Sequence, residues 1–329
     1  MVIKDYSSET LSLDYGVPQG YVLGLILYTL YTQPLGALIR RHNINFQMYA
    51  DDTQLYQSMK PEDISLLITS MQNCIEDVRN WMISNKLKMN EDKTIVMMCD
   101  PKKKRAYNVR SISIDNESVY FTDNARNLGV VFNNNLTLET HFSNVSRTLY
   151  YEFRRISQLS RFLTKTSLKT LLLAFIMTRI DYCNSLFVNL PDDSLKLLQR
   201  FQNRAAKMVL GGRKSDHVTP LLISLHWLPV KARVTYKIVL LAFRIIHGMA
   251  PQYLKELIEL YTPSRSLRSG TQCLLRVPKR SSVRLADRSF AHAAPSVWNS
   301  LPIEIRSIKN ENSFRSQLKT HLFRIHLLK

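Results

Sequence analysis

Two adjacent carboxylates, Asp51 and Asp52, are the side chains of this sequence best suited to chemistry; they follow Tyr49 and Ala50 and lie between two β-prone segments. Neighbouring carboxylates on a tight turn repel each other and gain nothing from burial. A turn tolerates them when they face water or when a divalent cation neutralises them, and magnesium prefers carboxylate and phosphate oxygens. Taken alone, the pair is consistent with either a solvated turn or a magnesium site.

The segments on either side predict how these carboxylates are positioned. In residues 44–48, Ile44, Phe46 and Met48 alternate with polar residues, which is the period-2 pattern of a half-buried strand. Residues 53–57 are again β-prone and half apolar. The sequence therefore predicts a β-hairpin that carries both carboxylates at its tip.

A second candidate site lies about thirty residues upstream, in front of the apolar run 22–30. Two glycines bracketing a proline predict a constrained backbone at the start of a helix, where a planar base or a sugar could approach closely. The residues of this segment are Gly16, Val17, Pro18, Gln19 and Gly20.

These two segments together resemble motifs B and C of reverse transcriptases, and specifically those of non-LTR (LINE-type, jockey-like) retrotransposons: GVPQG, an apolar helix, then YADDTQLY. The resemblance implies an RNA-directed DNA polymerase that uses two-metal nucleotidyl transfer. It implies that Asp51 and Asp52 hold Mg²⁺. Residues 16–20, with Tyr49 and Ala50, would shape the nucleotide and template pocket.

The resemblance extends downstream. Residues 85–94 resemble motif D, in which Lys93 would lie near the incoming triphosphate as a candidate proton donor to pyrophosphate. Leu128 and Gly129 fall in a segment similar to motif E, the primer-grip hairpin. Residues 225–233 and 290–302 look like the C-terminal region that follows the polymerase in such elements. The implied partners are an RNA template, a DNA primer and deoxynucleoside triphosphates.

Some features depart from the family pattern. An essential aspartate of the family comes from motif A, upstream of motif B, but only fifteen residues precede Gly16, and Asp5 and Asp14 lack the motif A context. Tyr21 stands where the family has serine, and Leu25 where it has proline. We therefore expect a 5′-truncated copy that is inactive alone, because a two-metal site needs carboxylates on both sides of the metals.

Charge is distributed unevenly along the chain, whose formal net charge is +19. Residues 1–100 hold 8 Lys and Arg against 12 Asp and Glu, whereas the remaining residues hold 37 against 14. A basic region behind an acidic site is what a polymerase that grips nucleic acid needs.

One predicted helix in the basic region carries cations at helical spacing. It begins after Pro191, has an apolar inner face, and ends at Gly211. Its cations could follow a phosphate backbone, as in a thumb helix along template and primer, or form an ordinary solvated face. They are Lys196, Arg200, Arg204 and Lys207.

The predicted fold class is α+β, with a partial polymerase palm (antiparallel sheet with helices) in residues 1–135, a mainly α-helical thumb-like region in 136–215 and a basic C-terminal region in 216–329. Apolar residues at three- and four-residue spacing predict a core-facing helix after Pro61. Further strands are expected at 94–99, 111–114, 118–121 and 128–132. Helices are expected from about 138 and over 167–187, the latter with buried Leu168, Leu171, Leu172, Phe175 and Ile176.

The cysteines and the apolar runs bear on the compartment. Four widely spaced cysteines show no zinc-ligand spacing, and Cys74 and Cys99 are expected to be buried free thiols, which favours a reducing compartment. No apolar run is long enough to span a bilayer. The chain is therefore expected to be intracellular, nuclear or cytoplasmic, and not membrane-bound. Pro101–Arg105 is either a basic nuclear import signal or a solvated loop.

Three functions stay open on this basis. The chain could be a polymerase fragment that needs a missing carboxylate, a protein that binds RNA or DNA without chemistry, or a translated relic with no stable fold. The resemblance favours the first.

Overall fold

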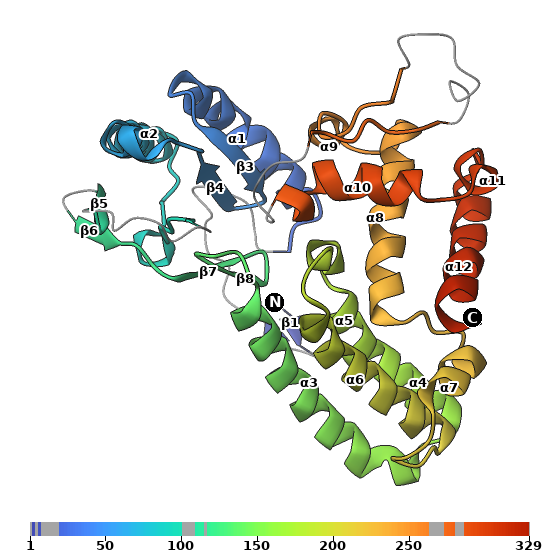
Figure 1. Cartoon of the computed structure of the whole chain (residues 1–329). Coiled ribbons are helices and arrows are strands. Elements are labelled where there is room, and N and C mark those ends of the chain that lie inside the picture. Colours follow the sequence, from blue (N-terminus) through green and yellow to red (C-terminus); the bar gives the residue numbers. More distant parts are fainter. Residues whose placement is uncertain are drawn as a thin grey trace. The chain divides into compact units, whose positions relative to one another are not determined.

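The computed structural model describes residues 20–100, 109–114, 117–262, 273–279 and 286–328, together with the backbone of Val2–Ile3 and Tyr6–Ser7 (Figure 1). The chain forms two compact units, one of residues 1–98 and 104–125 and the other of residues 99–103 and 126–329. Its described elements are helices and short two-stranded sheets, so the predicted α+β class is confirmed.

The first unit is built from two helices and several short hairpins. An antiparallel hairpin of β3 and β4 packs with the helices α1 and α2 around a small core. Its strands are β1 (Val2–Ile3), β2 (Tyr6–Ser7), β3 (Asn45–Tyr49), β4 (Asp52–Tyr56), β5 (Ser111–Ile114) and β6 (Glu117–Tyr120). Its helices are α1 (Gly24–Arg41), η1 (Pro61–Asp63), α2 (Ile64–Ser84) and η2 (Glu91–Lys93).

The core of the first unit follows the predicted apolar spacing only in part. Cys74 and Val78 of α2 are buried against Leu35 and Ile39 of α1. The other apolar residues at the predicted three- and four-residue spacing on α2 are half-buried. Ile44, just before β3, completes the fully buried set. A core this small leaves other apolar surface in solvent. On and just before α1 the exposed apolar side chains are Tyr21, Val22, Leu23, Leu25, Ile26, Leu27, Leu30 and Tyr31.

The predicted strand at 94–99 is wrong in extent, since only Val96 forms a bridge, to Phe121. Cys99 is exposed, so the expectation that it is a buried thiol was wrong; residues 97–100 belong to no strand. The predicted strands at 111–114 and 118–121 correspond to β5 and β6, which form an antiparallel hairpin.

The second unit is a helical bundle preceded by two short strands. The boundary between the units falls within β7 (Asn124–Asn127), which pairs with β8 (Val130–Asn133). The long helices are α3 (Glu139–Leu159), α6 (Asp192–Leu210), α8 (Val230–Ile246) and α12 (Glu311–Leu327). The shorter ones are η3 (Ser160–Phe162), α4 (Lys165–Leu172), η4 (Leu173–Met177), α5 (Thr178–Asp181), η5 (Asn184–Phe187), α7 (Val218–Leu225), α9 (Gln252–Lys255), η7 (Ala286–Arg288), α10 (Phe290–Asn299) and α11 (Ile303–Arg306).

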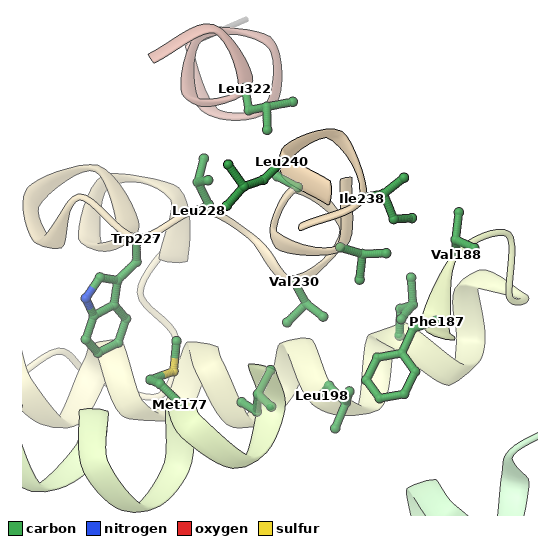
Figure 2. Close-up of a cluster of buried hydrophobic side chains, with 14 of the residues drawn as sticks. Met177, Phe187, Val188, Leu198, Trp227, Leu228, Val230, Ile238, Leu240 and Leu322 are labelled. Atoms are coloured by element: carbon green, nitrogen blue, oxygen red, sulfur yellow. The ribbon is translucent and has the colours of Figure 1, made fainter. Parts of the chain in front are cut away.

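Helix α8 is apolar around most of its circumference, and this is the pattern of a helix covered on several sides. It packs against α6 and η5 on one side and against α10 and α12 on others. Figure 2 shows Val230 of α8 above Leu198 of α6, with Leu240 facing Leu322 of α12. One hydrophobic core thus runs through the bundle. The predicted boundary between a thumb-like region (136–215) and a basic C-terminal region (216–329) stays a prediction.

The predicted helix over 167–187 contains a π-helical turn, Leu173–Met177. Leu168, Leu172, Ile176 and Ile180 are buried at intervals of four residues, whereas Phe175 is 42% exposed. The expectation that Phe175 is buried was wrong, because the wider turn changes the phase of the buried face after Leu172.

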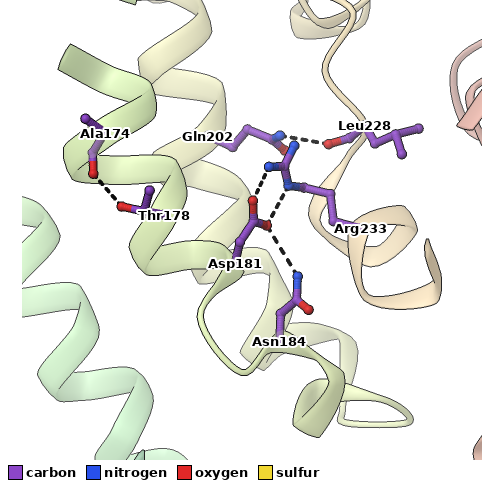
Figure 3. Close-up of polar contacts among 7 residues, drawn as sticks. All are labelled: Ala174, Thr178, Asp181, Asn184, Gln202, Leu228 and Arg233. Carbon is purple, nitrogen blue, oxygen red and sulfur yellow. Dashed lines mark hydrogen bonds and ion pairs between the residues drawn. The ribbon is translucent and has the colours of Figure 1, made fainter. Parts of the chain in front are cut away.

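An ion pair links the end of α5 to α8. Arg233 of α8 donates two hydrogen bonds to the carboxylate of Asp181, and Asn184 donates a third at 3.3 Å (Figure 3). Beside it, the fully buried amide of Gln202 donates to the carbonyl of Leu228 at 2.8 Å. These contacts give partners to the carboxylate of Asp181 and to the buried amide of Gln202, whereas the buried Oδ1 of Asn184 has no partner within the described structure.

Candidate active site

The turn between β3 and β4 carries both candidate carboxylates. The strands pair in register from Asn45 opposite Tyr56 to Tyr49 opposite Asp52, so that Ala50 and Asp51 form the connection. Ala50 adopts φ +52°, a left-handed conformation that lets a two-residue loop reverse the chain. Asp51 and Asp52 are both exposed at the tip, as predicted. Because the pair is in solvent, neither carboxylate loses its hydration to the fold.

Helix α1 holds the hairpin in place from one side. A Cβ on Gly36 would lie 2.9 Å from the ring of Phe46 in β3, so glycine permits this close approach. The guanidinium of Arg40 lies 5.1 Å from the centroid of the same ring. Together these contacts fix the face of the hairpin that points toward α1, and with it the direction of the tip.

Tyr28 of α1 was not identified from the sequence as a site residue. Partial burial, together with the negative charge of Asp51, raises the pKa of the Tyr28 hydroxyl above its ordinary value of 10.0. The phenol is therefore within electrostatic reach of the carboxylate. Its position seven residues before the buried Leu35 places it on the helix face that packs on the hairpin, and that spacing is the signal that could have found it.

The donor set at the tip suits magnesium in type. Mg²⁺ is commonly bound by one or two carboxylates together with waters and substrate phosphates, and Asp51 and Asp52 supply two hard oxygen ligands open to solvent. Among the residues that the structure describes, no group of three His, Cys, Asp or Glu side chains could hold a metal ion. Two carboxylates alone are fewer acidic ligands than a two-metal site uses.

The segment that resembles motif D is attached to both helices of the first unit. Tyr31 of α1 donates a hydrogen bond to the carbonyl of Asn85 at 2.8 Å, just after α2. The exposed Lys93 ends η2, and its backbone N–H donates to the side chain of Asn90 at 3.2 Å. Neither a hydrogen bond nor an ion pair joins Lys93 to Asp51 or Asp52 in the described part of the chain, so its role as a proton donor stays a prediction.

Only one residue of the predicted template pocket upstream of α1 can be placed. Gly20 has φ +90°, a conformation that favours glycine, and lies four residues before α1. This agrees with the constrained backbone predicted there. Gly16, Val17, Pro18 and Gln19 lie outside the described residues, as do Asp5, Asp14 and Pro101–Arg105.

The predicted primer-grip residues form the connection between β7 and β8. Leu128 and Gly129 have φ of +44° and +82°, the signs that a tight hairpin turn requires. The hydroxyl of Tyr182, just after α5, donates to the carbonyl of Leu128 at 2.6 Å, and a Cβ on Gly129 would lie 3.3 Å from the Tyr182 ring. The turn is therefore supported by the helical bundle. Strand β7 was missed because its sequence, NARN, has no β-prone residues.

The four predicted backbone-binding cations lie on α6, and two of them have local partners. Lys196 pairs with Asp193 at 2.8 Å, and Lys207 donates to the carbonyl of Lys214 at 2.6 Å. Arg200 and Arg204 are exposed, and the guanidinium of Arg204 lies 5.2 Å from the ring of Phe153 in α3. The two arginines are thus the better placed of the four to contact a ligand.

Comparison with known protein families bears on the first part of the chain. Residues 2–132 match the family model described as reverse transcriptase (RNA-dependent DNA polymerase). The matched region includes the β3–β4 turn and ends within β8, so residues 2–132 are similar to a reverse transcriptase domain. Enzymes of this family are in general Mg²⁺-dependent and bind template, primer and deoxynucleoside triphosphates. No curated protein and no solved structure matches the chain.

None of the described helices combines the length and the apolar character needed to cross a bilayer.

Proposed function

We propose that the chain is part of an RNA-directed DNA polymerase of a non-LTR, LINE-type retrotransposon. The observation that carries this proposal is the carboxylate pair at the β3–β4 turn, within residues that match the reverse transcriptase family. The non-LTR assignment is supported by the sequences of the two motifs, GVPQG and YADDTQLY, and by the downstream segments that resemble the same group.

In this function Asp51 and Asp52 bind Mg²⁺ at the tip of the hairpin. Bound there, Mg²⁺ would neutralise triphosphate charge and polarise the reacting oxygens. Leu128 and Gly129 present the backbone of a supported turn to the primer, and Arg200 and Arg204 offer charge to a phosphate backbone.

We also propose that the chain does not polymerise by itself. Two-metal transfer needs acidic ligands beyond a single adjacent pair. The described residues bring no third carboxylate to the turn, so a further acidic side chain has to complete the site. The exposed apolar surface of α1 is consistent with this proposal, because patches of this kind are usually covered by other protein.

Primer extension on an RNA template tests both parts of the proposal. We expect no extension by the chain with Mg²⁺. If extension does occur, and Asp51→Asn abolishes it while the exposed control Asp63→Asn does not, the chain is an active polymerase and the proposed inactivity is wrong. Extension that persists in Asp51→Asn would instead remove the carboxylate pair from the mechanism.

A nucleic-acid-binding function without chemistry is the second candidate. It is favoured by the positive charge of the chain after residue 100, which contains 37 Lys and Arg but only 14 Asp and Glu. The affinity for RNA measured by gel shift should then fall steeply as salt is raised, because bound phosphates release counterions. It should also be the same in Asp51→Asn. A flat salt response would contradict this function.

A further inference from the structure

The surface between α3 and α6 is hollowed at two adjacent places. The first hollow, of about 480 Å³, is lined by Tyr150, Arg154, Ser157, Gln158 and Arg204. The second, of about 370 Å³, is also lined by Tyr150, so the two adjoin at this side chain. We call them together the α3–α6 groove. The second hollow is lined by Glu139, Phe142, Ser143, Ser146, Arg147, Tyr150, Asp193, Ser194 and Leu197.

Tyr150 is an exposed aromatic ring held in a fixed orientation. Its side chain is 58% exposed, yet the ring packs edge-on against the buried Phe201 of α6, with centroids 4.8 Å apart. Most exposed tyrosines can change rotamer freely, whereas this one is anchored at the junction of two hollows. A fixed and open aromatic face is what a stacking site for a planar group needs.

The groove also carries positive charge beside that ring. Arg147, Tyr150 and Arg154 lie three and four residues apart on α3 and therefore share one face of the helix. Arg204 reaches the groove from α6, with its guanidinium 5.2 Å from the centroid of Phe153. Neither Arg147 nor Arg154 has an acidic partner among the described residues. Charge of this kind, alternating with an aromatic ring, suits a phosphate backbone with exposed bases.

A buried hydroxyl without a partner lines the same groove. Ser146 is 7% exposed, and its Oγ makes no hydrogen bond within the described structure. A buried polar atom that lacks a partner usually costs free energy, so the wall of the α3–α6 groove beneath Ser146 is not optimised for packing alone. Ser143 and Ser194 add hydroxyls to the lining, and the carboxylates of Glu139 and Asp193 add acceptors whose negative charge keeps phosphates in the first hollow, beside Arg154 and Arg204. These groups suit the polar edges of a base or a sugar.

We infer that the α3–α6 groove binds single-stranded nucleic acid, with an unpaired base stacked on Tyr150 and the adjoining phosphates on Arg154 and Arg204. Paired bases in a duplex are stacked on one another and do not offer a free face to a side chain. The inference rests on the nucleic-acid partner of the proposed function but not on catalysis. It differs from the contact of a thumb helix with the backbone of a duplex, because it requires the base.

Fluorescence anisotropy with the full chain tests the groove. A labelled ten-nucleotide single strand is expected to bind more tightly than a duplex or an abasic strand of the same length. Tyr150→Ala should weaken binding of the single strand about tenfold, since stacking on one aromatic ring contributes on that scale. The matched control is Tyr253→Ala, because Tyr253 is 54% exposed in the same unit but lies on α9. RNA and DNA strands are compared in parallel.

The arginines are tested through salt dependence. Arg154→Gln combined with Arg204→Gln should lower the slope of log affinity against log salt by about 1.4, which is 0.7 for each lost phosphate contact. Arg324→Gln, an exposed arginine on α12, is the control. Polyglutamate is added as a competitor to test whether the groove instead binds an acidic peptide. The inference is overturned if polyglutamate displaces the single strand as readily as it displaces the abasic strand.

A measurement on the unaltered chain does not depend on the variants folding. A single strand that contains 5-iodouridine should crosslink on irradiation to the peptide that contains Tyr150. The inference is wrong if crosslinks form only on other peptides, if Tyr150→Ala binds like Tyr253→Ala, or if the abasic strand binds as tightly as the complete one. None of these results bears on the metal site, which is tested at Asp51, so a failure of one proposal is distinguishable from a failure of the other.

Discussion

At the scale of single residues, the exposed carboxylates of the β3–β4 turn differ from a carboxylate that joins two helices of the bundle. Asp51 and Asp52 are exposed at a hairpin tip, where they have no burial to compensate. In contrast, Asp181 and Arg233 are partly covered and bond to each other within the helical bundle. The two kinds of carboxylate therefore respond differently to substitution.

Replacement of Asp181 by asparagine should destabilise the helical bundle by about 2 kcal/mol, because it leaves the mostly covered guanidinium of Arg233 without its charged partner. The free energy of unfolding from denaturant titration measures this change. Glu259→Gln is the control, since Glu259 pairs with Arg276 on the surface and both side chains are about two-thirds exposed. Equal effects of the two substitutions would contradict the structural role of the Asp181 pair.

The buried His141 should make the folded protein less stable in mild acid. Burial lowers the pKa of His141 below its ordinary value of 6.5. Its Nδ1 accepts the N–H of Val131 at 3.4 Å, and the rings of Phe142 and Phe187 lie beside it. The unfolded chain therefore takes up the proton more readily than the folded chain. The stabilisation is complete above pH 6.5 and is lost as the pH falls below it.

Thermal midpoints at pH 7.5 and pH 5.5 check this expectation. The difference between them should be smaller in His141→Asn, whose amide oxygen can accept the same N–H but does not titrate. His321, whose pKa is also lowered, leaves part of the dependence in both proteins. An unchanged difference in His141→Asn would show that His141 is not the group responsible.

At the scale of elements, the turns and strong helices could be predicted from the sequence, whereas features set by tertiary packing could not. Alternating apolar and polar residues predict the hairpin around Asp51, and apolar residues at three- and four-residue spacing predict the helix after Pro61. Gly211 predicts the end of α6. Strand β7 has no β-prone residues, and the π-helical turn that exposes Phe175 has no sequence signal. The α3–α6 groove depends on which helix faces pack together, which a single chain does not specify.

The turn between β7 and β8 offers a prediction at this scale. Gly129→Ala should destabilise the protein by roughly 2 kcal/mol, because a left-handed backbone is unfavourable for alanine and the new methyl group would crowd Tyr182 at 3.3 Å. Gly211→Ala at the end of α6 has φ +70° and open space around it, so it should cost only about 1 kcal/mol. Unfolding free energies that rank the two variants in the opposite order would contradict the role of Tyr182.

At the scale of the whole molecule, the two units differ in how much apolar surface they bury. The first has a small core between α1, α2 and the β3–β4 hairpin, and it exposes many apolar side chains on α1. The second has an extended core centred on α8. Because burial is the main source of stability, the units should open with different free energies.

Hydrogen–deuterium exchange measures this difference directly. Amides of α6 and α8 should exchange most slowly, while those of α1 and of the β3–β4 hairpin should exchange orders of magnitude faster. The reason is that opening the first unit exposes little additional apolar surface. Protection of α1 equal to that of α8 would contradict the account of two units with unequal cores.

Metal-directed cleavage tests most directly the proposal that Asp51 and Asp52 bind metal as part of a polymerase site. Fe²⁺ also takes oxygen ligands, and with ascorbate and peroxide it cuts the backbone near the place where it binds. We predict cuts close to residues 49–53 that excess Mg²⁺ suppresses, that Asp51→Asn combined with Asp52→Asn removes, and that Asp63→Asn retains. Cuts that remain in the double variant, or that fall only elsewhere in the chain, would contradict the claim.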